Sequence, residues 1–199
     1  MIIRSKPRIG IYAGSFDPIH VGHITFALQA LKASKLDSIY FLPERNPRSK
    51  VVQEHFGHRV AMIKQAIKPY KRFKLLELDD KRFSVSKTLP KLTSVFGERQ
   101  MVFLFGSDKV NQLASWPNAD KLFVSSGLII GLRQGDDLSQ IKLQAKARQP
   151  KSLDVINSYA PDVASTKIRA SLTNNQAADG LLTSVSRYIR RNWLYISIN

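Results

Sequence analysis

Short apolar runs alternate along this chain with segments of helical periodicity, and this alternation constrains the fold more than any other feature. Residues 100–105 form the clearest run, because every residue after Gln100 is apolar and Gly106 closes the run. Continuous apolar runs of this length are typical of strands that are buried on both faces of a parallel sheet. The predicted strands cover residues 8–14, 38–42, 73–78, 100–105, 127–132 and 152–156. The predicted helices cover residues 20–31, 56–67, 87–95, 109–113, 118–123, 139–148, 165–172 and 184–193.

Strands that alternate with helices predict an α/β fold in which a doubly wound parallel sheet carries helices on both faces. The chain has 199 residues, of which 43% are hydrophobic, enough to bury one sizeable core. We therefore expect one domain over residues 1–199, with a helical C-terminal part from about residue 160 to 199. Ligands bind such sheets at the carboxyl ends of the strands, so motifs directly after predicted strands are candidate site residues.

The charge balance is strongly basic, with 31 Lys and Arg residues against 15 Asp and Glu residues and a formal net charge of +16. Such a surface attracts phosphates, nucleic acid or acidic lipid, although excess lysine also serves solubility alone. The absence of cysteine excludes disulfides and thiolate chemistry. No run approaches the roughly 18 apolar residues of a membrane helix, and the N-terminus lacks a signal-peptide pattern. We therefore expect a soluble cytoplasmic protein.

The sequence Gly-Ser-Phe-Asp-Pro-Ile-His-Val-Gly-His occupies residues 14–23, at the first predicted strand-to-helix junction. A helix N-terminus presents unpaired N–H groups and a positive dipole end, both of which favour phosphate. Gly14 permits a tight turn, and Gly22 leaves space beside His20 and His23, which share one face of the first helical turn. Two imidazoles placed in this way suit hydrogen bonding to phosphate oxygens in a transition state. Taken alone, a His-x-x-His pair more often marks metal ligands or surface residues.

This decapeptide resembles the HxGH motif of the nucleotidyltransferase superfamily, and the resemblance to its bacterial nicotinate-nucleotide adenylyltransferases continues along the chain. Residues 164–169, Ala-Ser-Thr-Lys-Ile-Arg, are similar to the Ser-Ser-Thr-x-Ile-Arg signature of that family. The resemblance implies a Rossmann-like fold and the transfer of AMP from ATP to the phosphate of nicotinate mononucleotide, with release of pyrophosphate, in NAD biosynthesis. Further similar segments are residues 36–43, 59–62, 105–108 with Trp116, and 185–195.

The downstream residues also have a physical interpretation of their own. Ser165 and Thr166 are of the types that begin helices, so free N–H groups there, together with Arg169, are suited to hold a triphosphate. A capped helix with a surface arginine is the alternative. Asp108 follows a buried strand, so we expect its carboxylate either to accept hydrogen bonds from ribose hydroxyls or to cap the next helix. Trp116 stacks on the nicotinate ring if the resemblance holds, and otherwise anchors the core.

Two segments depart from the family pattern. Where the family has Pro-Pro-His followed by Lys or Arg, residues 47–50 are Pro-Arg-Ser-Lys, so Ser49 replaces the histidine while Lys50 keeps the cation. Residues 83–89 keep the family's Thr-Leu pair but lack the preceding Ser-Tyr-Thr, which helps to form the nicotinate pocket in the family. The acceptor therefore stays open, with nicotinamide mononucleotide or a sugar or lipid phosphate as alternatives.

The resemblance implies a set of site residues and a metal ion, Mg²⁺, that accompanies ATP. His20 and His23 are the implied catalytic residues, at the phosphates around the reacting centre. ATP and its phosphates are expected at Gly14, Ser15, Phe16, Lys50, Ser165, Thr166 and Arg169. The ribose and the acceptor are expected at Asp108, Trp116 and Arg133, although a solvated Arg133 is nearly as consistent with the sequence. Mg²⁺ is expected to accompany ATP through the substrate phosphates, without metal ligands from the protein.

The expected partners are therefore small molecules, ATP and a mononucleotide, rather than a membrane. A protein of a different class stays open as an alternative: a nucleotide- or RNA-binding relative that has lost catalysis, which the formal charge of +16 would suit. His55 and His58, which flank a predicted helix start, are interpreted as surface residues.

Overall fold

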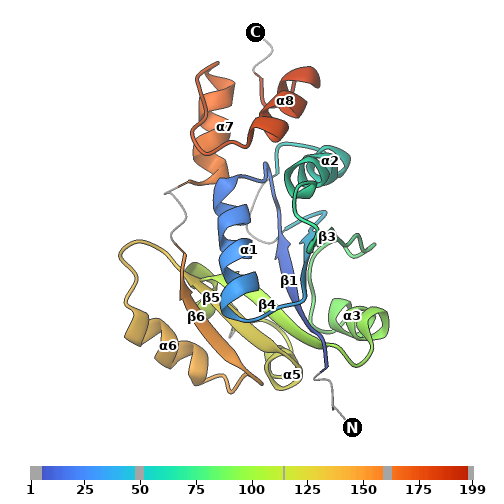
Figure 1. The fold of residues 1–199 in the computed structure, drawn as a ribbon, viewed down its shortest axis with the longest axis vertical. Coiled ribbons are helices and arrows are strands. Elements are labelled where there is room, and N and C mark those ends of the chain that lie inside the picture. The colour runs from blue at the N-terminus through green and yellow to red at the C-terminus, as the bar shows by residue number, and fades with distance from the viewer. Residues whose placement is uncertain (1–5, 48–51, 114, 159–162, 197–199) are drawn as a thin grey trace.

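The computed structural model describes residues 6–47, 52–113, 115–158 and 163–196. Its strands form a six-stranded sheet in the order β3-β2-β1-β4-β5-β6, and all neighbouring strands are parallel (Figure 1). The predicted α/β fold with a parallel sheet is thus confirmed. The strands are β1 (Arg8–Gly14), β2 (Ser38–Pro43), β3 (Phe73–Leu75), β4 (Gln100–Gly106), β5 (Gly127–Leu132) and β6 (Leu153–Asn157).

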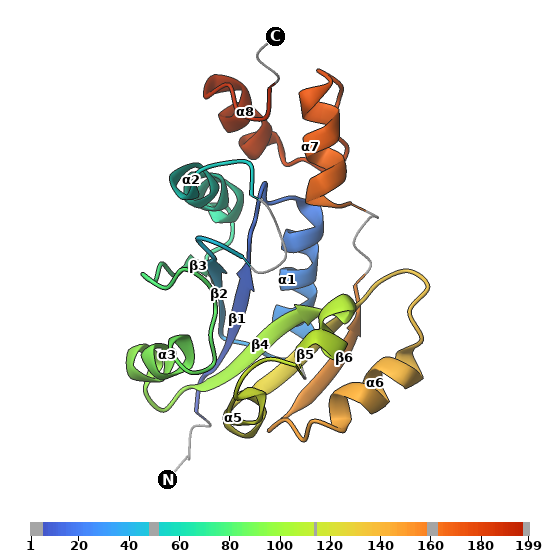
Figure 2. The ribbon, with the colours of Figure 1, turned by 180° about the vertical axis from the view of Figure 1, so that it is seen from behind.

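Helices cover both faces of the sheet (Figures 1 and 2). One face packs in a core cluster with α1 (Val21–Ala33), α2 (Phe56–Ile67) and α8 (Thr183–Arg191). The other face packs in a second cluster with α3 (Thr88–Phe96), α4 (Val110–Leu113), α5 (Ala119–Ser125) and α6 (Leu138–Lys146). A short 3₁₀ helix, Ser107–Lys109, joins β4 to α4, and α7 (Ser165–Thr173) lies beside α8 beyond the N-terminal end of α1.

The central strand β4 shows why its sequence is apolar without alternation. Val102 and Leu104 pack in the cluster on the α1 side, whereas Phe103 and Phe105 pack in the cluster on the opposite side. All four side chains are buried. Burial of a side chain of this size contributes about 1.5–3 kcal/mol, so a polar residue on either face of this strand would weaken one of the two cores.

Two element boundaries depend on more than local pattern. β3 ends at Leu75 and not at residue 78, because it is an edge strand whose pairing with β2 stops there and whose chain then turns away. The prediction for this strand was therefore too long. α3 begins at Thr88 and contains Pro90 within its first turn, where the missing N–H has no partner in the helix and proline is tolerated.

The sheet opens between β1 and β4, where the strand order reverses. β1 pairs with β4 only as far as Ile11 and Phe103. Each of these strands stays paired with its other neighbour to its last residue, Gly14 in β1 and Gly106 in β4. The carboxyl ends of β1 and β4 therefore separate into a crevice, the position at which open α/β sheets bind their ligands.

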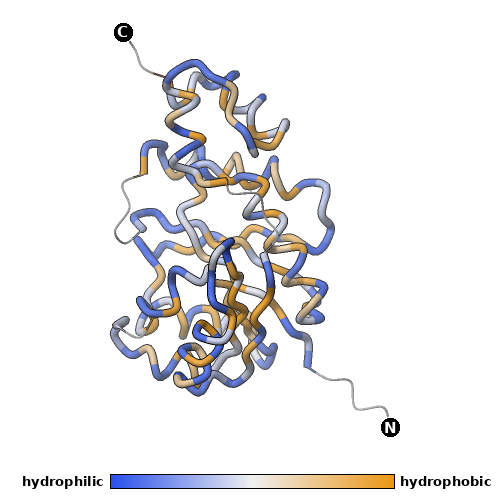
Figure 3. Tube along the Cα trace, turned by 90° about the vertical axis from the view of Figure 1, so that its left-hand side faces the viewer, coloured by the Kyte–Doolittle hydropathy of each residue, from blue (hydrophilic) through white to orange (hydrophobic). Residues whose placement is uncertain are grey.

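The C-terminal helices close the fold at that same edge of the sheet. Val185 and Ile189 of α8 are buried in the cluster with α1 and α2, as are Leu194 and Tyr195 of the tail. Hydrophobic and hydrophilic residues alternate along these helices, which is the pattern of helices with one buried side (Figure 3). No helix in the described part of the chain is long and apolar enough to cross a membrane.

Candidate active site

The loop from β1 to α1 turns around a buried aromatic ring. Phe16 is 1% exposed and has a left-handed backbone conformation with a φ of 48°. Its ring packs edge-on against Tyr12, with 5.4 Å between the ring centroids. A Cβ atom at Gly14 would lie 3.2 Å from the Phe16 ring, so glycine allows this close approach. Phe16 therefore shapes the loop, and its buried ring is not available to a ligand.

The two histidines of the motif lie in contact at the N-terminus of α1. His20 is the N-cap residue, directly before the helix, and His23 is the third residue of the helix. Their ring centroids are 3.8 Å apart, and the main-chain N–H of His20 donates to Nδ1 of His23 at 3.2 Å. An Nδ1 atom that accepts a hydrogen bond carries no proton, so Nε2 of the neutral His23 carries the proton and is a donor.

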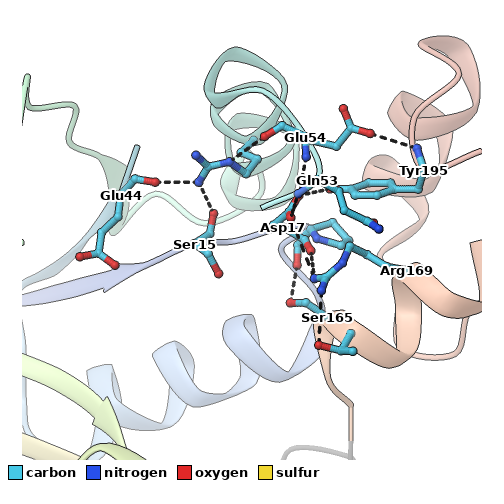
Figure 4. A network of polar contacts seen from close by, with 11 residues as sticks. Ser15, Asp17, Glu44, Gln53, Glu54, Ser165, Arg169 and Tyr195 are labelled. Carbon is cyan, nitrogen blue, oxygen red and sulfur yellow. Dashed lines mark hydrogen bonds and ion pairs between the residues drawn. The ribbon is translucent and has the colours of Figure 1, made fainter. Parts of the chain in front are cut away.

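The first turn of α7 is docked on the loop that precedes α1 (Figure 4). The Ser165 hydroxyl donates to the carbonyl of Pro18 at 3.1 Å, and Nη1 of Arg169 donates to the carbonyl of Asp17 at 2.8 Å. Nη2 of Arg169 also lies 3.4 Å from the Thr166 hydroxyl. The structure thus brings together the N-terminal ends of two helices whose motifs are far apart in sequence. Each end offers N–H groups of the kind that bind phosphate.

Asp17 is a buried polar centre that the sequence analysis did not single out. Its side chain is 1% exposed, and its carboxylate accepts the main-chain N–H of Gln53 at 2.8 Å and the hydroxyl of Tyr195 at 2.7 Å (Figure 4). Burial raises the pKa of the Tyr195 phenol, and the hydrogen bond to Asp17 raises it further. Asp17 stands in the recognised motif and Tyr195 in the similar C-terminal segment, but no local pattern links them.

Arg59 is a second polar centre that local pattern did not reveal. It is fully buried in α2, and its guanidinium donates to the carbonyls of Ser15 at 2.6 Å, Glu44 at 2.8 Å and Arg45 at 2.9 Å. Burial lowers the pKa of Arg59, while the Asp17 charge opposes this shift. Arg59 therefore ties the loop after β1 to the loop after β2. An arginine on the apolar face of a predicted helix was the available signal.

The carboxyl ends of β4 and β5 carry an ion pair. Nη2 of Arg133 lies 3.0 Å from Oδ1 of Asp108. A Cβ atom at Gly106 would lie 2.6 Å from that same carboxylate oxygen, so a side chain at position 106 would displace the carboxylate. Burial raises the pKa of the Tyr12 phenol and the Arg133 charge lowers it, which places Tyr12 within electrostatic reach of the pair. Two of the predicted acceptor residues are thus together at the open end of the crevice.

Trp116 packs against the aromatic core and is still partly accessible. Its ring packs edge-on against Phe105, with centroids 5.9 Å apart, and lies 5.8 Å from the ring of Phe83. It is only partly buried, so part of the indole is accessible. Residues 83–88, the segment that differs from the family pattern, therefore lie beside Trp116 through Phe83. The Asn118 amide also contacts this segment, because it donates to the Ser86 hydroxyl at 2.8 Å.

The remaining residues that the sequence pointed to are two histidines near α2 and two residues that the structure does not describe. Lys50 and Ser49 fall outside the described residues. His55 is exposed, as predicted, whereas His58 is half-buried and its Nδ1 lies 3.0 Å from the Tyr188 hydroxyl, so it also has a contact within the fold. Among the residues that the structure describes, no group of three or more His, Cys, Asp or Glu side chains is placed to hold a metal ion.

Comparisons with known proteins agree with this geometry. Residues 11–171 match the cytidylyltransferase-like family. A probable nicotinate-nucleotide adenylyltransferase from Neisseria meningitidis serogroup C is 30% identical over 94% of this chain and 98% of its own. A probable nicotinate-nucleotide adenylyltransferase from Shewanella frigidimarina is 34% identical over 94% of this chain and 99% of its own.

The solved structure of Plasmodium falciparum nicotinic acid mononucleotide adenylyltransferase complexed with NaAD has the same fold. It superposes with a TM-score of 0.79 over 95% of this chain and 97% of its own, at 21% identity. The parallel sheet, its crevice and its paired helix N-termini are those of a nucleotidyltransferase. The chain belongs to the cytidylyltransferase-like family and, within it, to the nicotinate-nucleotide adenylyltransferases, as its motifs indicated.

Proposed function

We propose that this protein transfers AMP from ATP to the phosphate of nicotinate mononucleotide, forming the dinucleotide and releasing pyrophosphate. The docking of α7 on the loop before α1 carries this proposal. Through Ser165 and Arg169 it sets two phosphate-binding helix ends side by side, next to His20 and His23. The substrate class is inferred from the relatives, which are probable nicotinate-nucleotide adenylyltransferases.

The proposed reaction is an in-line displacement at the α-phosphorus of ATP. A phosphate oxygen of the acceptor forms a bond to that phosphorus, and the bond from the phosphorus to the oxygen that bridges to the β-phosphate breaks. The electron pair of the broken bond leaves with pyrophosphate. The acceptor phosphate is already ionised near neutral pH, so the reaction needs positioning and charge stabilisation more than a general base.

We assign His20 and His23 to the phosphates at the reacting centre. Because Nδ1 of His23 is engaged by the main chain, its Nε2–H is the donor that stabilises charge as it develops. We assign Gly14, Ser15, Thr166 and Arg169 to the triphosphate, and also Lys50, which lies outside the described residues. Phe16 contributes the shape of the loop and not a side-chain contact.

ATP is proposed to enter as its magnesium complex. Mg²⁺ keeps several waters and is commonly held through substrate phosphates with few protein ligands. The described residues fit this form of the substrate, because the two helix ends offer N–H donors to its phosphates.

The acceptor is proposed to lie across the crevice from the triphosphate. Asp108 and Arg133 suit its ribose hydroxyls and phosphate, and the accessible part of Trp116 suits a planar ring. The changed segment 83–88 still packs against Trp116 through Phe83. An aromatic wall is therefore present here even though the Ser-Tyr-Thr pattern is not.

Pyrophosphate release measured over a panel of donors and acceptors tests the proposal. ATP and CTP are each paired with nicotinate mononucleotide, nicotinamide mononucleotide and a sugar phosphate. We expect the highest kcat/KM for ATP with nicotinate mononucleotide. A higher kcat/KM with another acceptor would reassign the substrate, and no release with any pair would favour a binding protein that has lost catalysis.

A further inference from the structure

The C-terminal tail is tied to the loop before α1 by one tyrosine. The Tyr195 hydroxyl donates to Oδ1 of Asp17 at 2.7 Å, and its main-chain N–H donates to the Glu54 carboxylate at 3.0 Å (Figure 4). Its carbonyl accepts the Thr173 hydroxyl at 3.3 Å. Tyr195 thus contacts three segments: the loop before α1, the turn before α2 and the end of α7.

The backbone of this tail is held in a costly conformation. Tyr195 has a φ of 61° and Trp193 a φ of 54°, and left-handed conformations at residues other than glycine persist where the surrounding contacts outweigh a cost of about 1–3 kcal/mol. Tyr195 is 6% exposed, so its hydroxyl reaches Asp17 through the protein interior. The conformation therefore serves to place this hydroxyl.

The electrostatics around Asp17 explain what the hydroxyl does. Asp17 is a buried carboxylate whose Oδ1 has one short donor, the Tyr195 hydroxyl, and one long donor, the main-chain N–H of Glu54 at 3.4 Å. The Arg169 guanidinium is a cation beside it, with Nη1 4.0 Å from Oδ2 and 2.8 Å from the Asp17 carbonyl. A buried carboxylate that loses its short donor is left poorly satisfied, which favours a closer contact with the cation beside it. Without the Tyr195 hydroxyl, Arg169 would turn from the helix ends toward the carboxylate.

We propose that Tyr195 is a positioning residue for ATP, acting through Asp17 to keep the Arg169 guanidinium available to the triphosphate. This inference rests on the proposed function, because it assumes that Arg169 contacts ATP. The C-terminal tail thereby has a role in ATP affinity, although it is far along the chain from the first motif. The acceptor side of the crevice is not involved.

Tyr195→Phe is the decisive variant, because it removes the hydroxyl and keeps the ring. We expect KM for ATP and the dissociation constant for ATP to rise about tenfold, as for one hydrogen bond to a charged group. KM for the acceptor and kcat should change less than about threefold. Tyr188→Phe is the matched control, because it removes a hydroxyl that contacts His58 in the same C-terminal segment. ATP affinity should be unchanged in this control.

A double-mutant cycle separates positioning from loss of fold. If Tyr195 acts through Arg169, adding Tyr195→Phe to Arg169→Ala will change ATP affinity less than about twofold. Equal losses in both backgrounds, or a Tyr195→Phe protein that melts earlier yet binds ATP normally, would overturn the inference. Direct titration with ATP keeps the two proposals distinct. Failure of the unsubstituted protein to bind ATP defeats the proposed function, whereas unchanged binding in Tyr195→Phe defeats only the role of Tyr195.

Discussion

The main-chain N–H of His20 donates to Nδ1 of His23 at 3.2 Å, so the helix backbone itself selects the tautomer of His23. With Nδ1 occupied as an acceptor, the neutral ring carries its proton on Nε2. The same bond satisfies one of the N–H groups at the beginning of α1. His23 is therefore oriented by the main chain at the beginning of the helix, and its position three residues after residue 20 makes this bond possible.

His23→Ala should lower kcat by on the order of a hundredfold or more, because one preorganised donor to the developing charge is removed. KM for ATP should change much less, since the interaction strengthens in the transition state. Steady-state kinetics by pyrophosphate release measure both constants. His55→Ala, which removes an exposed histidine at the start of α2, should leave kcat unchanged. An unaltered kcat in His23→Ala would remove His23 from the mechanism.

Arg133→Ala should raise KM for nicotinate mononucleotide about tenfold, as expected for one charge-assisted hydrogen bond. Stability should change by less than about 1 kcal/mol, because the Arg133 side chain is 66% exposed and its pair with Asp108 is at the surface. Arg99→Ala is the control, because Arg99 is exposed just before the amino end of β4. A rise in KM for ATP and not for the acceptor would place Arg133 on the other side of the crevice.

Arg59→Met should lower the free energy of unfolding by about 3–5 kcal/mol, because buried carbonyls lose a charged donor. The carbonyls of Ser15, Glu44 and Arg45 are the groups affected. Urea titration followed by circular dichroism measures the change. Lys68→Met, at the exposed end of the same helix, should stay within about 0.5 kcal/mol. A loss below about 1 kcal/mol in Arg59→Met would show that these carbonyls find other donors.

Alkaline pH should weaken the fold partly through Tyr195, whose pKa in the folded protein is raised above its ordinary value of 10.0 by burial and by Asp17. The unfolded chain releases this proton near pH 10 while the folded chain keeps it. The stabilisation is therefore complete below that pH and declines above it, by up to about 1.4 kcal/mol per pH unit for each such phenol. Tyr195→Phe should have a shallower decline in urea titrations between about pH 9 and pH 11. Equal slopes in both proteins would contradict the shift.

Local pattern predicted most elements because their causes are local. The apolar run of β4 and the helical periodicity of α1 are visible in any window of the sequence, and both elements stand where the pattern indicated. β3 was predicted too long because the end of an edge strand depends on where its neighbour stops pairing. The His20 and His23 motif and the Ser165 to Arg169 motif were found for the same local reason.

The sequence by itself determined the order of strands and helices, the residue types at the phosphate motifs and the family. Only the tertiary structure decided which distant groups meet: Arg169 with Asp17, Tyr195 with Asp17, and Arg59 with the carbonyl of Ser15. The physical reason is that a buried polar group must find a hydrogen-bond partner, and the partner can come from any segment that the fold brings near. Sequence spacing carries no information about that choice, so these contacts became visible only once the chain was folded.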